Sequence, residues 1–382
     1  MLDDAHSLAG RHVVFLSWRD SGNPEAGGAE LYLDRMATGL VQRGCRVTVF
    51  SARYPGTPDD EVENGIRYVR RGSKLSVYAQ GMWQVLTRRL GRPDVVVDVQ
   101  NGLPFFSPVV TRAPVVVLVH HVHHEQWPIV YPGLVGRIGW FLEHRVSPWL
   151  YRGHQYVAVS AATRADLRRQ GVDQDNVVVV HNGIDPVHRI DATRAPYPML
   201  CVVSRLVPHK RIEHAIDTVV ALADEVPGIR LHVVGDGWWR GHLHDYVELL
   251  GAGDLVVFEG HVSEERKQQI YERAWLMLFP SIKEGWGLVV GEAGQHGTPT
   301  IAYAEAGGTT ESIIDGVSGV LVHDKRQFVE AARQLLHDPD RLAKLSRGAR
   351  EHSDRFTWPQ AQEAFARVLQ GALEGERVTA GL

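Results

Sequence analysis

The chain has 382 residues, of which 44% are hydrophobic and 23% are charged, and its formal net charge is -4. These values are typical of a globular protein of two or three domains, and they exclude a disordered, collagen-like or coiled-coil chain. The weak negative charge gives no electrostatic reason to expect binding to nucleic acid.

The first half of the chain alternates short β-branched runs with longer amphipathic segments. The predicted strands are 12–16, 46–50, 94–99, 115–119, 156–159 and 177–180, and the predicted helices include 29–43 and 161–170. Valine-rich runs such as 115–119 are typical of parallel strands that are buried on both faces. This half therefore predicts a doubly wound α/β domain.

The second half repeats the alternation. Its predicted strands are 199–203, 230–234, 255–258, 276–279, 299–303 and 319–322, with a helix over 211–225. The segment 186–198 has three prolines and no sustained periodicity, so it predicts a linker. We expect one domain over residues 1–187, a second over 188–357, and a last helix within 358–382. Open sheets of this class bind ligands at the carboxyl ends of their strands, which predicts a cleft between the domains.

The two cysteines, Cys45 and Cys201, form no CxxC pair, which excludes a disulfide framework and a cysteine-built zinc site. The first ten residues are too acidic for a signal peptide, and no apolar run approaches the ~18 residues that cross a bilayer. We therefore expect a cytoplasmic protein.

Two loops have the composition of phosphate-binding sites. Gly27 and Gly28 open the helix that follows the first strand, where backbone N–H groups attract anions, although such glycines can also serve only to turn the chain. Arg205 and Lys210 follow the strand at 199–203 and could hold a diphosphate. The alternative for this pair is a solvated basic turn.

Two glutamates, Glu284 and Glu292, lie eight residues apart in the sequence EGWGLVVGE, after the strand at 276–279. A carboxylate accepts hydrogen bonds from the hydroxyl groups of a sugar or a ribose. The alternative is an acidic helix N-terminus, which does not explain the Gly-Trp-Gly insertion.

A cluster of histidines follows the strand at 115–119, in the sequence HHVHHE (120–125). Four imidazoles and a carboxylate could bind a metal, but the spacing is not HExxH and no second cluster completes a site. We expect no metal. His123 and His124 could be a surface cluster, whereas His120 is the functional candidate.

Together these segments resemble the retaining nucleotide-sugar glycosyltransferases of family 4, which have the GT-B fold. The matching segments are GGAE (27–30), NGID (182–185), SRLVPHK (204–210), GDG (235–237), FEGHV (258–262), SIKEGWGLVVGE (281–292), AGGTTESI (306–313), GVSGVLV (316–322) and FTW (356–358). The resemblance implies two Rossmann-like domains that face a central cleft. It also implies an acceptor-binding N-terminal domain, a donor-binding C-terminal domain, and a C-terminal helix that crosses back to the N-terminal domain.

The resemblance implies roles for individual residues. Arg205 and Lys210 would hold the donor diphosphate and stabilise the leaving group, Glu292 would bind the ribose, and Glu284 would bind the donor sugar. A histidine, His120 or else His121, would contact the donor sugar near the reacting carbon. Further donor contacts would fall on Gly27, Gly28, Gly235, His261, Val262, Gly285, Trp286, Gly287 and Leu288.

We therefore expect a metal-independent hexosyltransferase with a UDP- or GDP-sugar donor, retention of configuration and no cofactor. The acceptor would be a saccharide, a lipid or a small glycoside. The alternatives are an epimerase or phosphorylase of the same fold, a non-catalytic sensor of sugar nucleotides, and an NAD-dependent oxidoreductase. The last lacks support because no GxGxxG follows the first strand.

A basic stretch, Arg70–Arg92, contains six Lys and Arg residues and no acid, interleaved with apolar residues. Such a surface could bring the protein to the inner face of an anionic membrane. The alternative is an ordinary amphipathic helix whose apolar side belongs to the core.

Overall fold

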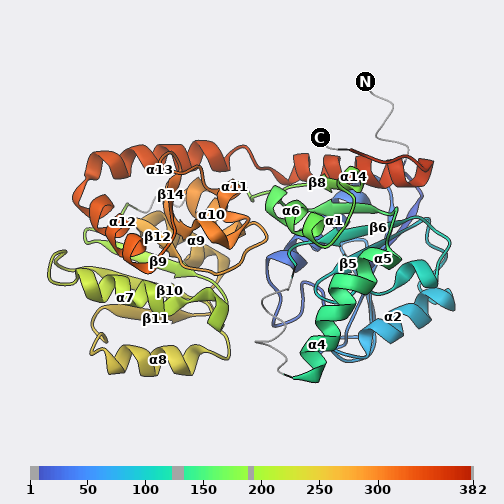
Figure 1. The fold of residues 1–382 in the computed structure, drawn as a ribbon, viewed down its shortest axis with the longest axis horizontal. Coiled ribbons are helices and arrows are strands. Elements are labelled where there is room, and N and C mark those ends of the chain that lie inside the picture. The colour runs from blue at the N-terminus through green and yellow to red at the C-terminus, as the bar shows by residue number, and fades with distance from the viewer. Residues whose placement is uncertain (1–7, 123–132, 188–192, 380–382) are drawn as a thin grey trace. The chain divides into compact units, whose positions relative to one another are not determined.

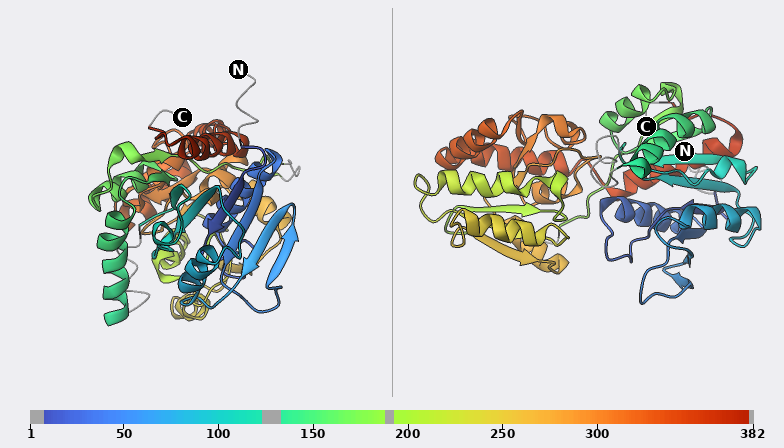
Figure 2. Two further views of the ribbon diagram at one scale, coloured as in Figure 1. Left: turned by 90° about the vertical axis from the view of Figure 1, so that its right-hand side faces the viewer. Right: turned by 60° about the horizontal axis from the view of Figure 1, so that its bottom comes forward.

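The computed structural model describes residues 8–122, 133–187 and 193–379. The chain divides into two compact units (Figure 1). Unit 1 consists of Met1–Gly183 and Trp358–Leu382, and unit 2 consists of Ile184–Thr357. Each unit is an open sheet with helices on both faces (Figure 2), so the prediction of two doubly wound α/β units is confirmed.

Unit 1 is built on an eight-stranded sheet with the order β3-β4-β2-β1-β5-β6-β7-β8. The strands are β1 (His12–Leu16), β2 (Arg46–Ser51), β3 (Asp60–Glu63), β4 (Ile66–Arg70), β5 (Val95–Gln100), β6 (Val115–Val119), β7 (Gln155–Ala158) and β8 (Val177–Val179). The helices are α1 (Gly28–Gln42), α2 (Val77–Leu86), α4 (Leu134–Phe141), α5 (Ser147–Leu150), α6 (Ala161–Arg169) and α14 (Trp358–Glu374). Only β3 and β4 pair antiparallel within this described sheet.

Valines of the central strands form the core of unit 1. Val96 of β5 lies in register with Val115 of β6, and their neighbours Val97 and Val116 are fully buried. Burying such a side chain contributes about 1.5–3 kcal/mol relative to leaving it exposed, which holds both strands in the middle of the sheet.

The last helix, α14, returns to unit 1 and covers one face of its sheet. Phe365 stacks on Phe15 of β1 with 6.1 Å between the ring centroids. Gln362 donates a hydrogen bond to the backbone oxygen of Arg35 in α1 at 2.7 Å. The C-terminal helix therefore packs with the N-terminal part of the chain, as the family resemblance implied.

Unit 2 is built on a parallel six-stranded sheet with the order β11-β10-β9-β12-β13-β14. The strands are β9 (Met199–Val203), β10 (Arg230–Val234), β11 (Val256–Gly260), β12 (Leu276–Phe279), β13 (Thr300–Tyr303) and β14 (Gly319–Val322). The helices are α7 (Ile212–Leu222), α8 (Arg240–Leu249), α9 (Glu264–Arg273), α10 (Leu288–Gln295), α11 (Thr309–Ser312), α12 (Lys325–His337) and α13 (Pro339–Ser353).

All twelve predicted strands are present, each within two residues of its predicted ends. The hairpin of β3 and β4 was not predicted, because three of the four residues of β3 are acidic and the strand lies exposed at the edge. No helix in the described part of the chain is long and apolar enough to span a membrane.

Candidate active site

The candidate donor residues of unit 2 gather at the carboxyl edge of its sheet. Arg205 follows β9, Gly235 follows β10, His261 follows β11, and Glu284 follows β12. These four strands are neighbours and run parallel, so their ends meet at one edge. Open α/β sheets bind their ligands there, and the topology thus brings together loops that are far apart in the sequence.

The loops after β9 and β10 are in direct contact through their backbones. The Leu206 N–H donates to the Asp236 oxygen at 2.9 Å. Gly235 has a φ of 121°, and a Cβ at this position would overlap the carbonyl oxygen of Ser204. A Cβ at Gly237 would overlap the Leu206 oxygen in the same way. Both glycines of the GDG segment are therefore required for the two loops to close on each other.

Lys210 and Glu284 form an ion pair that joins the loops after β9 and β12. Their side chains are only 14% and 12% exposed, so the pair is largely shielded from water. The two loops are also joined through their backbones, because the Ile282 N–H donates to the His209 oxygen at 2.9 Å. This pair places a cation and a carboxylate at the strand edge, where a ligand could separate them.

The loop that carries Glu284 rests on the glycines that follow β13. The Glu284 N–H donates to the Ala306 oxygen at 2.7 Å, and the Gly308 N–H donates back to the Glu284 oxygen at 3.1 Å. A Cβ at Gly308 would overlap the carbonyl oxygen of Gly285. Sequence reasoning assigned no site role to Gly308, although its segment, AGGTTESI, was one of those that matched the family.

The side chain of Trp286 is buried inside unit 2. It is 3% exposed, and its ring packs edge-on against Phe356 with 4.7 Å between centroids. Gly287 follows with a φ of 88° and precedes the first residue of α10, Leu288. Within the Gly-Trp-Gly insertion, the buried indole of Trp286 therefore anchors the loop, and Gly287 directs the chain into α10.

Glu292 is held by two residues of α9 that sequence reasoning missed. Tyr271 donates to Glu292 Oε2 at 2.9 Å, and Lys267 Nζ lies 3.0 Å from the same oxygen. Burial lowers the pKa of Lys267, but the carboxylates of Glu292 and Glu264 outweigh burial and leave that pKa raised. Nothing in the sequence pattern of α9 distinguishes these two side chains from ordinary helix residues.

In unit 1, Gly27 precedes α1 as its N-cap and Gly28 is the first helical residue. The Gly27 N–H donates to Glu30 at 2.8 Å, and the buried Glu30 also accepts from Arg19 at 2.6 Å. The sequence led us to expect exposed N–H groups here. That expectation is wrong for Gly27, because the capping carboxylate of Glu30 already occupies its N–H group.

His120 follows β6 and is 5% exposed. Its ring packs nearly perpendicular to that of Tyr32 from α1, with 5.3 Å between the ring centroids, and its backbone oxygen accepts a hydrogen bond from Thr163 of α6 at 2.9 Å. The structure therefore brings His120 beside the helix that Gly28 begins. His121 is half-buried, whereas His123 and His124 lie outside the described residues. Over residues 8–122, 133–187 and 193–379, no cluster of three metal-ligating side chains is found.

The basic stretch Arg70–Arg92 is divided by the fold. Arg70 is 3% exposed, donates to Asp20 at 2.6 Å and pairs with Glu61. Arg71 donates to the backbone oxygen of Asp59 at 2.6 Å. Arg70 therefore joins the loop after β1 to β3, Arg71 holds the loop after β2, and the outward-facing part of the stretch begins at Lys74.

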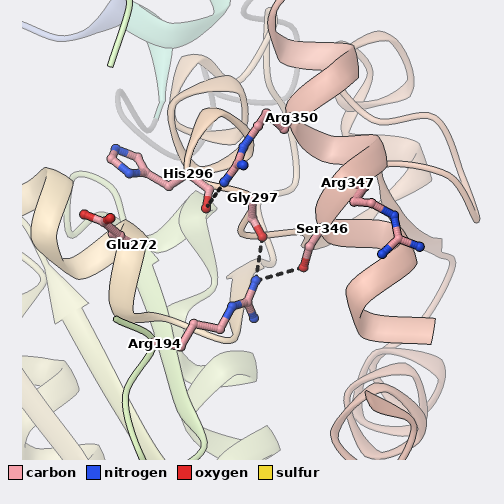
Figure 3. A pocket seen from close by; sticks show the side chains of 7 residues that line it. All are labelled: Arg194, Glu272, His296, Gly297, Ser346, Arg347 and Arg350. Carbon is pink, nitrogen blue, oxygen red and sulfur yellow. Dashed lines mark hydrogen bonds between the residues drawn. The ribbon is translucent and has the colours of Figure 1, made fainter. Parts of the chain in front are cut away.

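A separate hollow of about 250 Å³ lies in unit 2 among α9, α10 and α13 (Figure 3). None of the predicted site residues lines it. Arg194 donates to the Gly297 oxygen at 2.7 Å, and Arg350 donates to the His296 oxygen at 3.3 Å. These guanidinium groups satisfy carbonyl groups at the end of α10, where cations are stabilising, so the hollow has a structural explanation.

Two family models match the chain one after the other. The model described as Glycosyltransferase Family 4 matches residues 26–188, and the model described as Glycosyl transferases group 1 matches residues 185–352. The D-inositol 3-phosphate glycosyltransferase of Streptomyces bingchenggensis is 32% identical, and the match covers 96% of this chain and 90% of that protein. The glycogen synthase of Mycobacterium tuberculosis is 27% identical, with 96% of each chain covered.

Two solved structures share the fold. Sucrose-phosphate synthase from Thermosynechococcus elongatus matches with a TM-score of 0.80 and 20% identity, over 96% of this chain and 100% of that one. HepE from Anabaena, in complex with UDP-glucose, matches with a TM-score of 0.73 and 20% identity, over 94% and 99% of the two chains.

Proposed function

The chain belongs to the group 1 and family 4 glycosyltransferases, and from this premise we propose that it transfers a hexosyl group from a nucleoside diphosphate sugar with retention of configuration. The observation that carries the proposal is the convergence of Arg205, Lys210 and Glu284 at the carboxyl edge of one sheet. Family membership also sets aside the NAD-dependent alternative.

The donor diphosphate would bind by exchange with Glu284. Lys210 is paired with that carboxylate in the structure, and a diphosphate offers the ammonium group a more highly charged partner. Once released, Glu284 remains fixed by its two backbone hydrogen bonds and can accept hydrogen bonds from the donor sugar. Arg205 and Lys210 would neutralise the diphosphate as it departs, so the proposal assigns this work to side chains and requires neither a metal nor a cofactor.

The nucleoside would lie beside Glu292 and the loops after β10 and β11. Tyr271 and Lys267 orient the Glu292 carboxylate, which suits it to accept hydrogen bonds from ribose hydroxyl groups. Backbone atoms of Gly235, His261 and Val262 would border the base. HepE was solved with UDP-glucose, which supports a UDP-sugar for this chain, with a GDP-sugar as the alternative.

Retention is assigned to attack by the acceptor hydroxyl on the anomeric carbon of the sugar, from the face on which the diphosphate leaves, while an oxygen of the departing diphosphate takes the hydroxyl proton. Glu284 could serve instead as a nucleophile, as in retaining hydrolases. We favour an orienting role, because its carboxylate lies beside Lys210 and its backbone is bonded on both sides. His120, whose ring is packed against Tyr32, is proposed to contact the donor sugar.

The acceptor is assigned to unit 1 and is a saccharide, a lipid or a small glycoside. The relatives named above act on different acceptors according to their names, so they do not choose among these classes. Both cysteines are free and buried, which supports a reducing, cytoplasmic setting.

The test is proton NMR of the products that the purified full chain forms from an α-linked UDP-hexose and each of a panel of acceptors. An α-linked product supports the proposal, whereas a β-linked product overturns retention. Formation of a sugar phosphate or of an epimerised donor would identify the alternative activities, and binding without turnover of any acceptor would favour a sensor. Glu284→Gln should lower the rate at least about a hundredfold, and Glu265→Gln, on the exposed side of α9, is the matched control.

A further inference from the structure

Residues 134–150 of unit 1 form one continuous helix in three stretches. They are α4 (Leu134–Phe141), a π-helical turn (Leu142–Val146) and α5 (Ser147–Leu150). This helix, which we call the 134–150 helix, runs along the side of unit 1 and reaches its lower end in Figure 1.

The most buried residues of this helix are small or polar, and Leu150 at its end also packs against the core of unit 1. Gly136, Gly139, Glu143 and Ser147 are all buried. They recur every three or four positions, so they share one face. An ordinary surface helix buries its large apolar side chains there.

The opposite side exposes large apolar side chains. They are Leu134 (71% exposed), Val135 (58%), Ile138 (50%), Phe141 (53%) and Trp149 (73%). We call these five residues the apolar face. The exposed side of the helix is thus largely apolar, with Arg145 between Phe141 and Trp149, and a group of exposed apolar side chains of this kind marks a site of interaction.

Every exposed Lys, Arg, Asp or Glu residue within the segment 133–152 is an arginine. Between 133 and 152 the arginines are Arg137, Arg145 and Arg152, and all three are exposed. The one acid in this segment, Glu143, is 3% exposed and lies on the protein side. A second copy of the chain docked by two-fold symmetry would bring these arginines against their own copies with no acid to compensate. An anionic lipid surface complements both the charge and the apolar face.

Helix α2 of unit 1 also exposes apolar and basic side chains, on a smaller scale. Trp83 and Leu86 are 52% and 59% exposed, and Arg88 and Arg89 follow them on the surface. Both helices lie toward the lower end of unit 1 in Figure 1, so α2 adds to the same kind of surface.

We propose that the 134–150 helix docks the protein on an anionic membrane, with its apolar face inserted among the lipid headgroups and its arginines on the phosphates. The inference goes beyond the proposed transfer reaction and does not depend on the donor site. It assigns the main membrane contact to a helix outside the Arg70–Arg92 stretch, of which only the part from Lys74 onward, including α2, faces outward.

The test is cosedimentation of the full chain with vesicles of phosphatidylcholine alone or of phosphatidylcholine with one third phosphatidylglycerol. We expect binding to the anionic vesicles that weakens as salt is raised. Ile138→Ser with Phe141→Ser should lower the partition coefficient by at least about tenfold. Leu249→Ser removes a leucine of unit 2 that is still more exposed (81%) and should change nothing.

A second experiment reverses the charges of two arginines of the helix. Arg137→Glu with Arg145→Glu should reduce binding to anionic vesicles by at least about tenfold. Arg168→Glu, an exposed arginine of α6, is the matched control. UDP binding and the thermal midpoint should be unchanged in every variant, which separates this proposal from the donor site and from misfolding.

Three results would overturn the proposal. They are no binding of the unaltered chain to anionic vesicles, binding that the Ile138 and Phe141 substitutions leave intact, or an equal loss in the control variants. A dimer in solution that the Ile138 and Phe141 substitutions convert to monomer, without vesicle binding, would identify a second copy of the chain as the occupant instead.

Discussion

Replacing Lys210 by methionine removes the cation from a pair whose side chains are only 14% and 12% exposed. Glu284 then keeps its charge in a largely shielded position. Breaking a buried pair costs about 3–5 kcal/mol, and we expect about 3 kcal/mol here because both side chains retain some contact with water. For a unit of this size the loss corresponds to a fall of about 6–12 °C in the thermal midpoint.

The assay is scanning calorimetry of the full chain, in a cycle of Lys210→Met, Glu284→Gln and the double variant. The double variant carries no charge at positions 210 and 284, so its loss should fall short of the sum of the single losses by about 1–2 kcal/mol. Lys344→Met, at an exposed position of α13, should leave the midpoint unchanged. Strictly additive losses, or a Lys210→Met midpoint no lower than that of the control, would refute the reasoning.

The Lys210–Glu284 pair also predicts that Glu284→Gln affects the binding of UDP differently from the binding of a UDP-hexose. Glu284→Gln removes the competitor for Lys210, so UDP should bind at least as tightly as it does to the unaltered chain. A UDP-hexose should lose its advantage over UDP, because the amide replaces the carboxylate that accepts the sugar hydroxyl groups. Weaker UDP binding by Glu284→Gln in calorimetric titration would contradict the proposed exchange.

Three further predictions test other parts of the structure. Lys267→Met should weaken UDP binding about tenfold in titration calorimetry, because Glu292 loses the ammonium group that orients it; an unchanged affinity would argue against that role. Gly308→Ala should lower the thermal midpoint by several degrees because its Cβ overlaps the facing loop, whereas Gly241→Ala, with nothing within 4 Å of its Cβ, should not. Burial lowers the pKa of His296 to about 4. As the pH falls, the unfolded chain therefore protonates His296 before the folded chain does. The stability that neutral His296 contributes is fully present above pH ~6.5 and is lost as the pH drops toward ~4. The thermal midpoint should vary less with pH in His296→Asn.

The strands were predictable because their sequence signal is local. Runs such as 115–119 are apolar throughout, as the centre of a parallel sheet requires, and the loops that follow them carry recognisable glycines and charges. The positions of Arg205, Gly235, His261 and Glu284 at one edge follow from strand order alone, once the sheet is known to be parallel.

Features that depend on distant partners were not predictable. Arg70 reads as a surface cation in the sequence, and only its contact with Asp20, fifty positions earlier, explains why it is buried. The ion pair of Lys267 with Glu292 likewise joins two separate helices, α9 and α10. The apolar residues of the 134–150 helix have the composition of a core helix. Only the structure shows that the glycines of α4 are buried and that Leu134, Ile138 and Phe141 are exposed.

The central claim is that unit 2 binds a nucleoside diphosphate without the help of a metal ion. Titration calorimetry of the full chain with UDP, GDP, ADP and NAD, each with and without a chelator, tests it most directly. The account predicts that UDP or GDP binds equally well with chelator present, and that Arg205→Ala and Glu292→Ala abolish binding while Arg326→Ala, at an exposed position of α12, does not. Binding of NAD alone, or loss of nucleotide binding on chelation, would contradict it.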